Sequence, residues 1–236
     1  MNSRMISGLK WAIAAATLWA AASEPVIAAE PKTIPLFNGK DLDGWHTAFR
    51  FPEMDQDLFK VRDGMIHVLG EQEHLSEQSF AGIITDEEYS DYLLRLEYQW
   101  GQKKFKPRHE FVRDAGVIVH VHGEEKIWPF GVECQIQEGD TGDIWAIGTQ
   151  VTAPVSPVIR NYAPDGTRVT RGGAGERPFA RFHRGYSWEK QGWNQLELEV
   201  RGDYAKFTVN GHVVNEAFDM KYFDEDEQAW KPLTRG

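Results

Sequence analysis

The sequence is poor in cysteine, in basic charge and in helical patterns, and each shortage excludes a class of protein. With Cys134 as its single cysteine, the chain cannot form a disulfide within itself. Lys and Arg total 26 against 36 Asp and Glu, and a net charge of −10 argues against nucleic acid as a partner, because phosphates are neutralised by basic surfaces. Aromatic residues are plentiful, at 9 Trp, 13 Phe and 7 Tyr, and exclude a disordered chain.

Long hydrophobic runs are also missing, except at the N-terminus. Arg4 and Lys10 provide a short positive region, an apolar run of 12 residues covers 11–22, and small residues follow up to Ala29. This layout is typical of a bacterial secretory signal peptide, predicted to be removed as residues 1–29, with the protein then periplasmic or secreted. The alternative is an uncleaved anchor, although a membrane span needs about 20 residues. No cysteine follows the run, so a lipoprotein anchor is not indicated.

The remaining residues, 30–236, are predicted to form a single domain with its own core. After cleavage the chain would hold 24 basic and 35 acidic residues, and no later stretch is long and apolar enough to cross a membrane. About 200 residues suffice for a stable hydrophobic core without disulfides. The sequence does not specify an oligomeric state.

Alternation of apolar and polar residues with period two dominates this domain and predicts strands. Each such segment has one apolar face for a core and one polar face for water or a ligand. The clearest cases are 92–100, 115–122, 131–137, 193–200 and 204–210. Tight hairpins are predicted at Asp63-Gly64 and Asn210-Gly211, because Gly, Asn and Asp tolerate positive φ. Many short antiparallel strands without strong helices indicate an all-β sandwich or jelly roll.

Two stretches interrupt the alternation. Residues 102–113 are basic, and residues 153–191 are rich in Pro and Gly, with seven Arg or Lys against three Asp or Glu. The second is far longer than a usual connection of about 4–6 residues, which predicts either a functional loop or disorder.

Five segments in order carry a resemblance to a known family: IPLFNGKDLDGW, YSDYLLRLEYQW, DAGVIVHV, GVECQIQEGDTGDIW and GWNQLELEVRGDYAKFTVNGHVVNEA. Together they resemble the 3-keto-disaccharide hydrolase domain family, over about Ile34 to the C-terminus. The resemblance implies a concanavalin-like, laminarinase-type jelly roll that hydrolyses glycosides. Asp114-Ala115-Gly116 departs from the family's usual Asn-Ser-Gly, and the end at Gly236 implies that one or two closing strands are missing, which would leave a sheet edge unpaired.

The segment GVECQIQEGDTGDIW is the predicted site. Glu133 and Gln135 lie two residues apart, so both project from one face of a strand. With Glu138 they form Glu-x-Gln-x-x-Glu, which resembles the Glu-x-Asp-x-x-Glu motif of laminarinase-type glycosidases, although the central acid is an amide here. A retaining pair needs carboxyls about 5–5.5 Å apart, which Glu133 and Glu138 reach only across a bulge. The alternative is a solvated strand face.

His120 is the second candidate, on the polar face of the preceding strand. If the two strands pair, His120 and Glu133 become neighbours, and an imidazole beside a carboxylate serves as acid or base near neutral pH. A surface histidine is the alternative. No cofactor is predicted, but a divalent metal is left open on two sets of residues: His120 with His122, or the acidic turn of Glu138, Asp140 and Asp143.

Aromatic and basic residues complete the candidate list. Trp128, Trp145 and Trp193 could each stack on a sugar, with Trp145 nearest the site strand, while Trp45 and Trp100 follow the apolar alternation of a core. Arginines of the long stretch could line an anionic transition state, or could simply be solvated: Arg160, Arg168, Arg171, Arg177, Arg181 and Arg184.

The chemistry implied by the resemblance starts from the ketone at C3, which acidifies the proton on C2. A base removes this proton, the C1 substituent leaves from the enolate, and water adds to the enone. Glu133 or His120 would transfer the proton, and Gln135, Trp145, Glu138 and Arg181 would contact the sugar. Stabilising the enolate oxygen would be the largest contribution. The alternatives are a non-catalytic carbohydrate-binding jelly roll and a structural partner in a surface assembly.

Overall fold

The computed structural model describes residues 32–51, 58–173 and 179–236. By its internal contacts the chain divides into Met1–Ile34 and Pro35–Gly236, and every described strand belongs to the second unit. The predicted signal peptide, residues 1–29, lies outside the described residues. A search of the described part for a helix of membrane-spanning length and hydropathy finds none.

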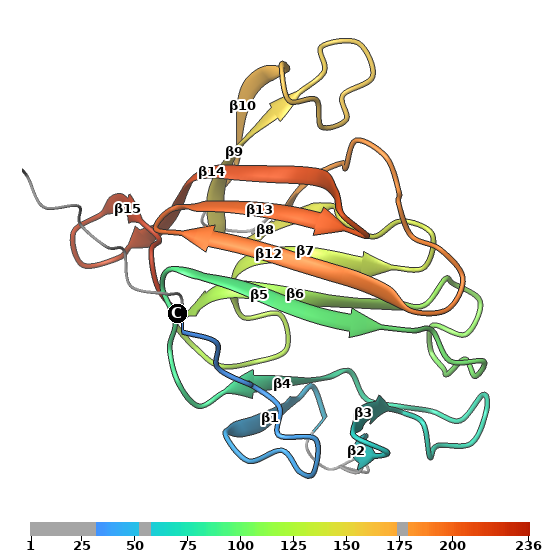
Figure 1. Cartoon of the computed structure of the whole chain (residues 1–236). Helices are drawn as coiled ribbons and strands as arrows, with labels where there is room; N and C mark the ends of the chain where they lie inside the picture. The colour runs from blue at the N-terminus through green and yellow to red at the C-terminus, as the bar shows by residue number, and fades with distance from the viewer. Residues whose placement is uncertain (1–31, 52–57, 174–178) are drawn as a thin grey trace, which may run out of the picture. The chain divides into compact units, whose positions relative to one another are not determined.

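Strands make up the second unit, and the described residues contain no helix (Figure 1). The first five strands are β1 (Trp45–Phe49), β2 (Phe59–Arg62), β3 (Met65–Val68), β4 (Ala81–Thr85) and β5 (Tyr92–Tyr98). The next five are β6 (Asp114–His122), β7 (Phe130–Gln137), β8 (Ile144–Ile147), β9 (Thr149–Val155) and β10 (Thr167–Gly172). The last five are β11 (Phe179–Phe182), β12 (Asn194–Arg201), β13 (Tyr204–Val209), β14 (His212–Asp224) and β15 (Ala229–Pro232).

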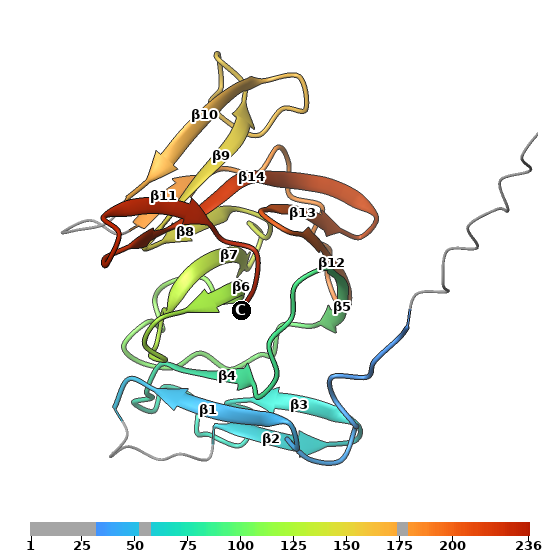
Figure 2. The same cartoon turned by 90° about the vertical axis from the view of Figure 1, so that its left-hand side faces the viewer.

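Two sheets form the sandwich. The larger has the order β10-β9-β14-β13-β12-β5, with β15 also paired to β14, and the smaller has the order β11-β8-β7-β6. Two further small sheets, β1-β4 and β2-β3, lie together in both views (Figures 1 and 2). The predicted all-β jelly-roll sandwich is confirmed.

The core lies between the two large sheets. It draws apolar side chains from alternate positions of strands in both, as period-two alternation predicts. The larger sheet gives Leu196, Leu198, Val200, Phe207 and Val209, and the smaller gives Val132, Cys134, Ile136 and Ile144.

Two predicted hairpins are confirmed. The β2–β3 turn has Asp63 at φ 52° and Gly64 at φ 73°, and the β13–β14 turn has Asn210 at φ 48° and Gly211 at φ 82°. Positive φ at both central residues gives the turn a twist that matches that of the strands it joins, which explains why these residue pairs occur here.

The prediction for residues 153–191 was incomplete. That stretch includes β10 and β11, which pair with β9 and β8 at the edges of the two sheets. β10 and β11 contain no proline, and Pro157 and Pro164 lie in the connection between β9 and β10. β11 brings Arg181 onto the smaller sheet, the sheet that also holds Trp145 and Glu133.

The C-terminal residues make backbone contacts with earlier parts of the domain. β15 pairs with β14, and Gly236 exchanges two backbone hydrogen bonds with Tyr89, of 3.0 and 3.3 Å. The absence of further closing strands stays a prediction.

Candidate functional site

The site is built on the face of the smaller sheet that points away from the core. Strand register places Arg181 of β11 opposite Trp145 of β8, and Trp145 opposite Glu133 of β7. Directly opposed residues of antiparallel strands project from the same face. These three side chains therefore form one row across three strands, and Gln135 lies on the same face two residues along β7.

Glu133 occupies a space that its neighbour leaves open. Gly116 of β6 lies opposite Gln135, and a Cβ placed on it would overlap the Glu133 carboxyl. The side chain of Glu133 is thus folded over the glycine backbone and is only 8% exposed. Any residue larger than glycine at position 116 would displace the carboxyl.

Burial changes the acidity of this carboxyl. Loss of hydration raises the pKa of Glu133 to about 7, and the nearby negative charge of Asp114 adds to the effect. A carboxyl with a pKa near 7 exists in both protonation states at neutral pH, so it can both accept and return a proton.

Asp114 links Gln135 to the basic loop that precedes β6. Gln135 donates through Nε2 to Asp114 Oδ1 and to the carbonyl of Ala115, the second at 3.1 Å. Arg108 Nη2 lies 2.8 Å from Asp114 Oδ2. Burial raises the pKa of Asp114, and the charges of Arg108 and Arg181 with the Gln135 hydrogen bond reduce that rise.

Arg181 is held by a fully buried aspartate. Its Nε donates to Asp143 Oδ2 at 2.5 Å, and its guanidinium carbon lies 5.3 Å from the centre of the Trp145 ring. Asp143 also receives Arg184 Nη1 at 2.9 Å and the Arg184 backbone N–H at 2.8 Å. These bonds fix the position of a cation beside Trp145 without leaving the buried carboxylate unpaired.

A scan against family models matches residues 32–236 to the 3-keto-alpha-glucoside-1,2-lyase-like domain. The chain belongs to this family. The predicted family is confirmed. The chain thus contains a hydrolase-like domain that processes glycosides.

Two further comparisons add little. A search of the curated proteins finds no match. Among solved structures, the chain is similar to a candidate glycosyl hydrolase from Parabacteroides distasonis ATCC 8503, with 18% identity, over 77% of this chain and 69% of the other. The TM-score is 0.43, so this likeness carries no argument.

Within this lyase-like domain, Glu138 is not a partner for Glu133. The β6–β7 register shows no shift between Val132 and Gln137, so the bulge needed to bring the two carboxyls together is absent there. Glu138 instead lies 2.5 Å from Arg113 Nη1. Slight burial would raise the pKa of Glu138, but its hydrogen bonds with Arg113 and the charge of that residue lower it overall. The retaining geometry, which depended on that bulge, is therefore wrong, and a contact of Glu138 with the sugar stays a prediction.

The predicted pairing of His120 with Glu133 is also wrong. A register shift between Val119 and His122 and a φ of 54° at His120 break the alternation of β6. The His120 ring is buried, and its Nε2 lies 3.0 Å from the carbonyl oxygen of Gly202, in the β12–β13 turn of the other sheet. Burial lowers the pKa of His120 despite that hydrogen bond.

The two metal hypotheses find no support in the geometry. The described residues contain no group of three His, Cys, Asp or Glu side chains that could hold a metal ion. His122 points its Nδ1 at the carbonyl of His120, 3.3 Å away. The acidic turn is paired with arginines: Asp140 and Asp143 with Arg184, as Glu138 is with Arg113.

Sequence reasoning missed three residues of the site. Asp114 stood out only as a departure from the family's Asn-Ser-Gly, whose glycine Gly116 matches, and Arg108 only as part of a basic stretch. Their roles depend on the β6–β7 register, which brings Gly116 under Glu133 and the start of β6 beside Gln135. The one sequence feature that indicated such contacts was the excess of basic residues in 102–113, close in sequence to an acidic site strand.

Proposed function

We propose that this domain cleaves the glycosidic bond of a 3-keto glycoside or disaccharide, with Glu133 as the base that removes the proton on C2. The observation that carries the proposal is a buried carboxyl with a pKa of about 7, in a row with an aromatic ring and a fixed arginine. The family description, a 3-keto-alpha-glucoside-1,2-lyase-like domain, supports the same chemistry.

The reaction runs as elimination followed by hydration. Glu133 takes the C2 proton, and the electrons of that C–H bond form the C2=C3 double bond of an enolate, with the negative charge on O3. The enolate then reforms its ketone, C1=C2 forms, and the C1–O bond breaks. The protonated Glu133 returns its proton to the leaving oxygen. Water finally adds its oxygen to C1 and a proton to C2, so that the sum is hydrolysis.

The neighbours of Glu133 have separate roles. Arg181, fixed by Asp143, would face the oxygen that gains charge in the enolate, which is where electrostatic stabilisation has most effect. Trp145 would stack on a sugar ring. Burial raises the pKa of Glu133, Asp114 would add to that rise, and Gln135 would hold Asp114 in place.

A purely carbohydrate-binding role is the alternative from another class. Binding alone does not need a buried carboxyl with a pKa near neutral pH, and burying one costs stability. The convergence of Glu133 and Asp114 therefore favours catalysis. We also propose that the domain acts after export, on the basis of the signal-peptide pattern in residues 1–29.

The test is turnover of 3-keto-trehalose and 3-keto-lactose by the exported chain, with and without chelator. Glu133→Gln should lose turnover, whereas Glu124→Gln, a matched change at an exposed carboxyl paired with Lys126, should keep it. Full activity of Glu133→Gln would refute the assignment. Loss of wild-type turnover with chelator would restore the metal hypothesis.

A further inference from the structure

A second surface of the domain carries aromatic rings in contact with solvent. The segment 185–195, which follows β11 and includes the first two residues of β12, exposes three of them: Tyr186 at 67%, Trp188 at 41% and Trp193 at 48%. Three large aromatic side chains exposed within eight residues are unusual on a protein surface without a ligand or partner. Trp188 and Tyr186 have no part in the row of residues around Glu133.

The rings of Tyr186 and Trp188 are held in place. Trp188 stacks on His212 with the ring centres 3.6 Å apart and the planes at 10°, and Tyr186 meets Trp188 edge-on at 5.1 Å. The backbone beneath them is tied to the β13–β14 hairpin. Asn210 Nδ2 donates to the Trp188 carbonyl at 2.8 Å, and the Gly185 N–H donates to the Val214 carbonyl at 3.0 Å.

Two buried or paired polar side chains fix the rest of the segment. Asn194 accepts from the Lys190 N–H at 2.8 Å and donates to the carbonyls of Lys190 and Gly192. Glu189 accepts from the Trp100 indole and from the Gly139 N–H. A surface that is ordered before binding loses less conformational entropy when a ligand binds, so the entropic cost of binding to this segment would be low.

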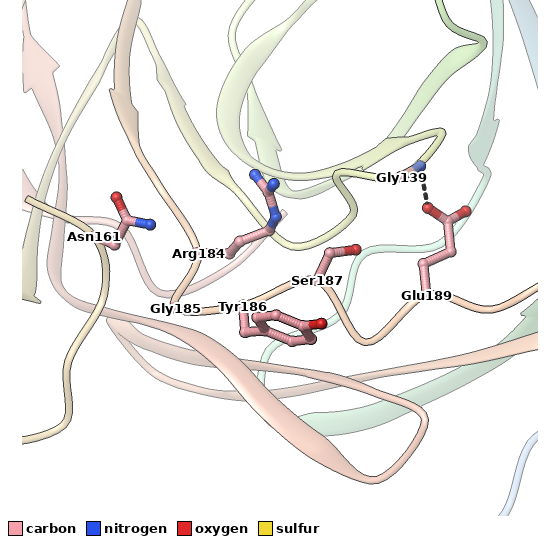
Figure 3. A pocket seen from close by; sticks show the side chains of 7 residues that line it. All are labelled: Gly139, Asn161, Arg184, Gly185, Tyr186, Ser187 and Glu189. Atoms are coloured by element: carbon pink, nitrogen blue, oxygen red, sulfur yellow. Dashed lines mark hydrogen bonds between the residues drawn. The ribbon is translucent and has the colours of Figure 1, made fainter. Parts of the chain in front are cut away.

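Two hollows are lined by this segment, one with Tyr186 and the other with Trp193. One has a volume of about 410 Å³ and is lined by Tyr186 with polar side chains, among them Asn161, Ser187 and Glu189. Figure 3 shows Tyr186 and Ser187 between Asn161 on one side and Glu189 on the other. The other hollow, about 340 Å³, is lined by Trp193, Glu97, Lys190 and the exposed Gln195, and by Asn194 and Asn210, whose amides are hydrogen-bonded within the protein.

We propose that this surface, defined as Tyr186, Trp188, Trp193 and the two hollows, binds a neutral glycan chain. Aromatic faces suit the C–H faces of sugar rings, and planar amides and carboxylates suit their hydroxyls. The lining is mostly polar, which favours a sugar over the apolar anchor of a protein partner. Arg184, the arginine of the first hollow, is already paired with Asp140 and Asp143, and the second hollow is lined by one residue of each charge, Lys190 and Glu97, so an anionic ligand is not favoured. The proposal does not rest on the reaction at Glu133.

Affinity electrophoresis of the exported chain tests this, in native gels that contain dissolved amylopectin, dextran, laminarin or galactomannan, with alginate as the anionic probe. We expect retardation in at least one neutral gel. Tyr186→Ala with Trp188→Ala should weaken it roughly tenfold or more. Trp193→Ala should weaken it as well, and Trp128→Ala, a change at a tryptophan of similar exposure (42%), should not.

Trp188→Phe keeps an aromatic ring over His212 and should retain most of the binding, which separates loss of the surface from loss of the fold. Turnover of 3-keto-trehalose should be unchanged in all these variants. The proposal is overturned if no neutral gel retards the chain, if alginate alone does, or if the alanine variants bind as the wild type does. Loss of turnover in Glu133→Gln with retained gel binding would support it independently.

Discussion

The two faces of strand β7 differ in what they bury. Toward the core the strand places Val132, Cys134 and Ile136, which are apolar and almost fully buried. On the opposite face it places Glu133 and Gln135, which are nearly as buried but polar. One strand thus supports a face that stabilises the fold and a face that costs stability. Buried polar groups of the second kind are typical of functional sites.

The polar face is built so that this cost stays limited. Gly116 opens the space for the Glu133 carboxyl, and the amide of Gln135 is satisfied by Asp114 and a backbone carbonyl. Arg108 pairs with Asp114 from the loop that precedes β6. The contrast between the faces therefore predicts that changes on the polar face act on catalysis and that changes on the core face act on stability.

The largest expected effect comes from two changes, one on the polar face of β7 and one in the core that its apolar face lines. Glu133→Gln should lower kcat for 3-keto-trehalose by about 10²–10⁴-fold, the range for loss of a general base, and leave the fold intact. Leu198→Ala, on β12 across the core from this sheet, should lower the free energy of unfolding by about 2–5 kcal/mol and leave kcat of the folded protein unchanged. Steady-state kinetics and urea denaturation of both variants check this. A large kcat loss in Leu198→Ala would contradict the separation.

Gly116→Ala should have the next largest effect. The added methyl would displace the Glu133 carboxyl, and a shift of about 1 Å in a catalytic group can cost about 10²-fold in rate. Gly82→Ala is a matched control, because a Cβ at that strand glycine meets no atom within 4 Å. Equal kcat in Gly116→Ala and the wild type would show that the carboxyl position is unimportant.

The sequence predicted most of the sandwich because period-two alternation and hairpin residues act locally. It predicted Glu133 and Gln135 on one face for the same reason. It failed at His120, where a bulge in β6 turned the ring toward the Gly202 carbonyl of the other sheet. It also missed Asp114, Gly116 and Arg108, because their proximity to the site strand depends on pairing between distant segments.

Stability should depend on pH through Glu133. Its pKa is about 7 in the folded protein against an ordinary 4.5, so the folded state holds this proton more tightly. The contribution of protonated Glu133 to the free energy of unfolding is therefore fully present below pH 4.5, and it is lost as the pH rises to about 7. Glu133→Gln should be more stable than the wild type at pH 8 by up to about 3 kcal/mol, and the gap should narrow at pH 5. Urea denaturation at both pH values measures it, and a gap that is independent of pH would contradict the raised pKa.

The smallest expected effect is a shift in a pH profile. Asp114→Asn removes the negative charge that helps to raise the pKa of Glu133. The acid limb of the pH profile, where kcat/KM rises as Glu133 loses its proton, should therefore move to lower pH. Asp140→Asn, a similar change at an aspartate outside the row around Glu133, should leave the limb in place. An unmoved limb in Asp114→Asn would show that burial alone sets the acidity of Glu133.

The most direct test of proton removal at C2 by Glu133 is cleavage of 3-keto-trehalose in D₂O, followed by NMR from pH 5 to pH 9. We predict that the 3-keto sugar product carries deuterium at C2, that the rate rises through a pKa of about 7, and that Glu133→Gln forms almost none of this product. Cleavage that leaves the original proton on C2, or unchanged labelling by Glu133→Gln, would contradict the account.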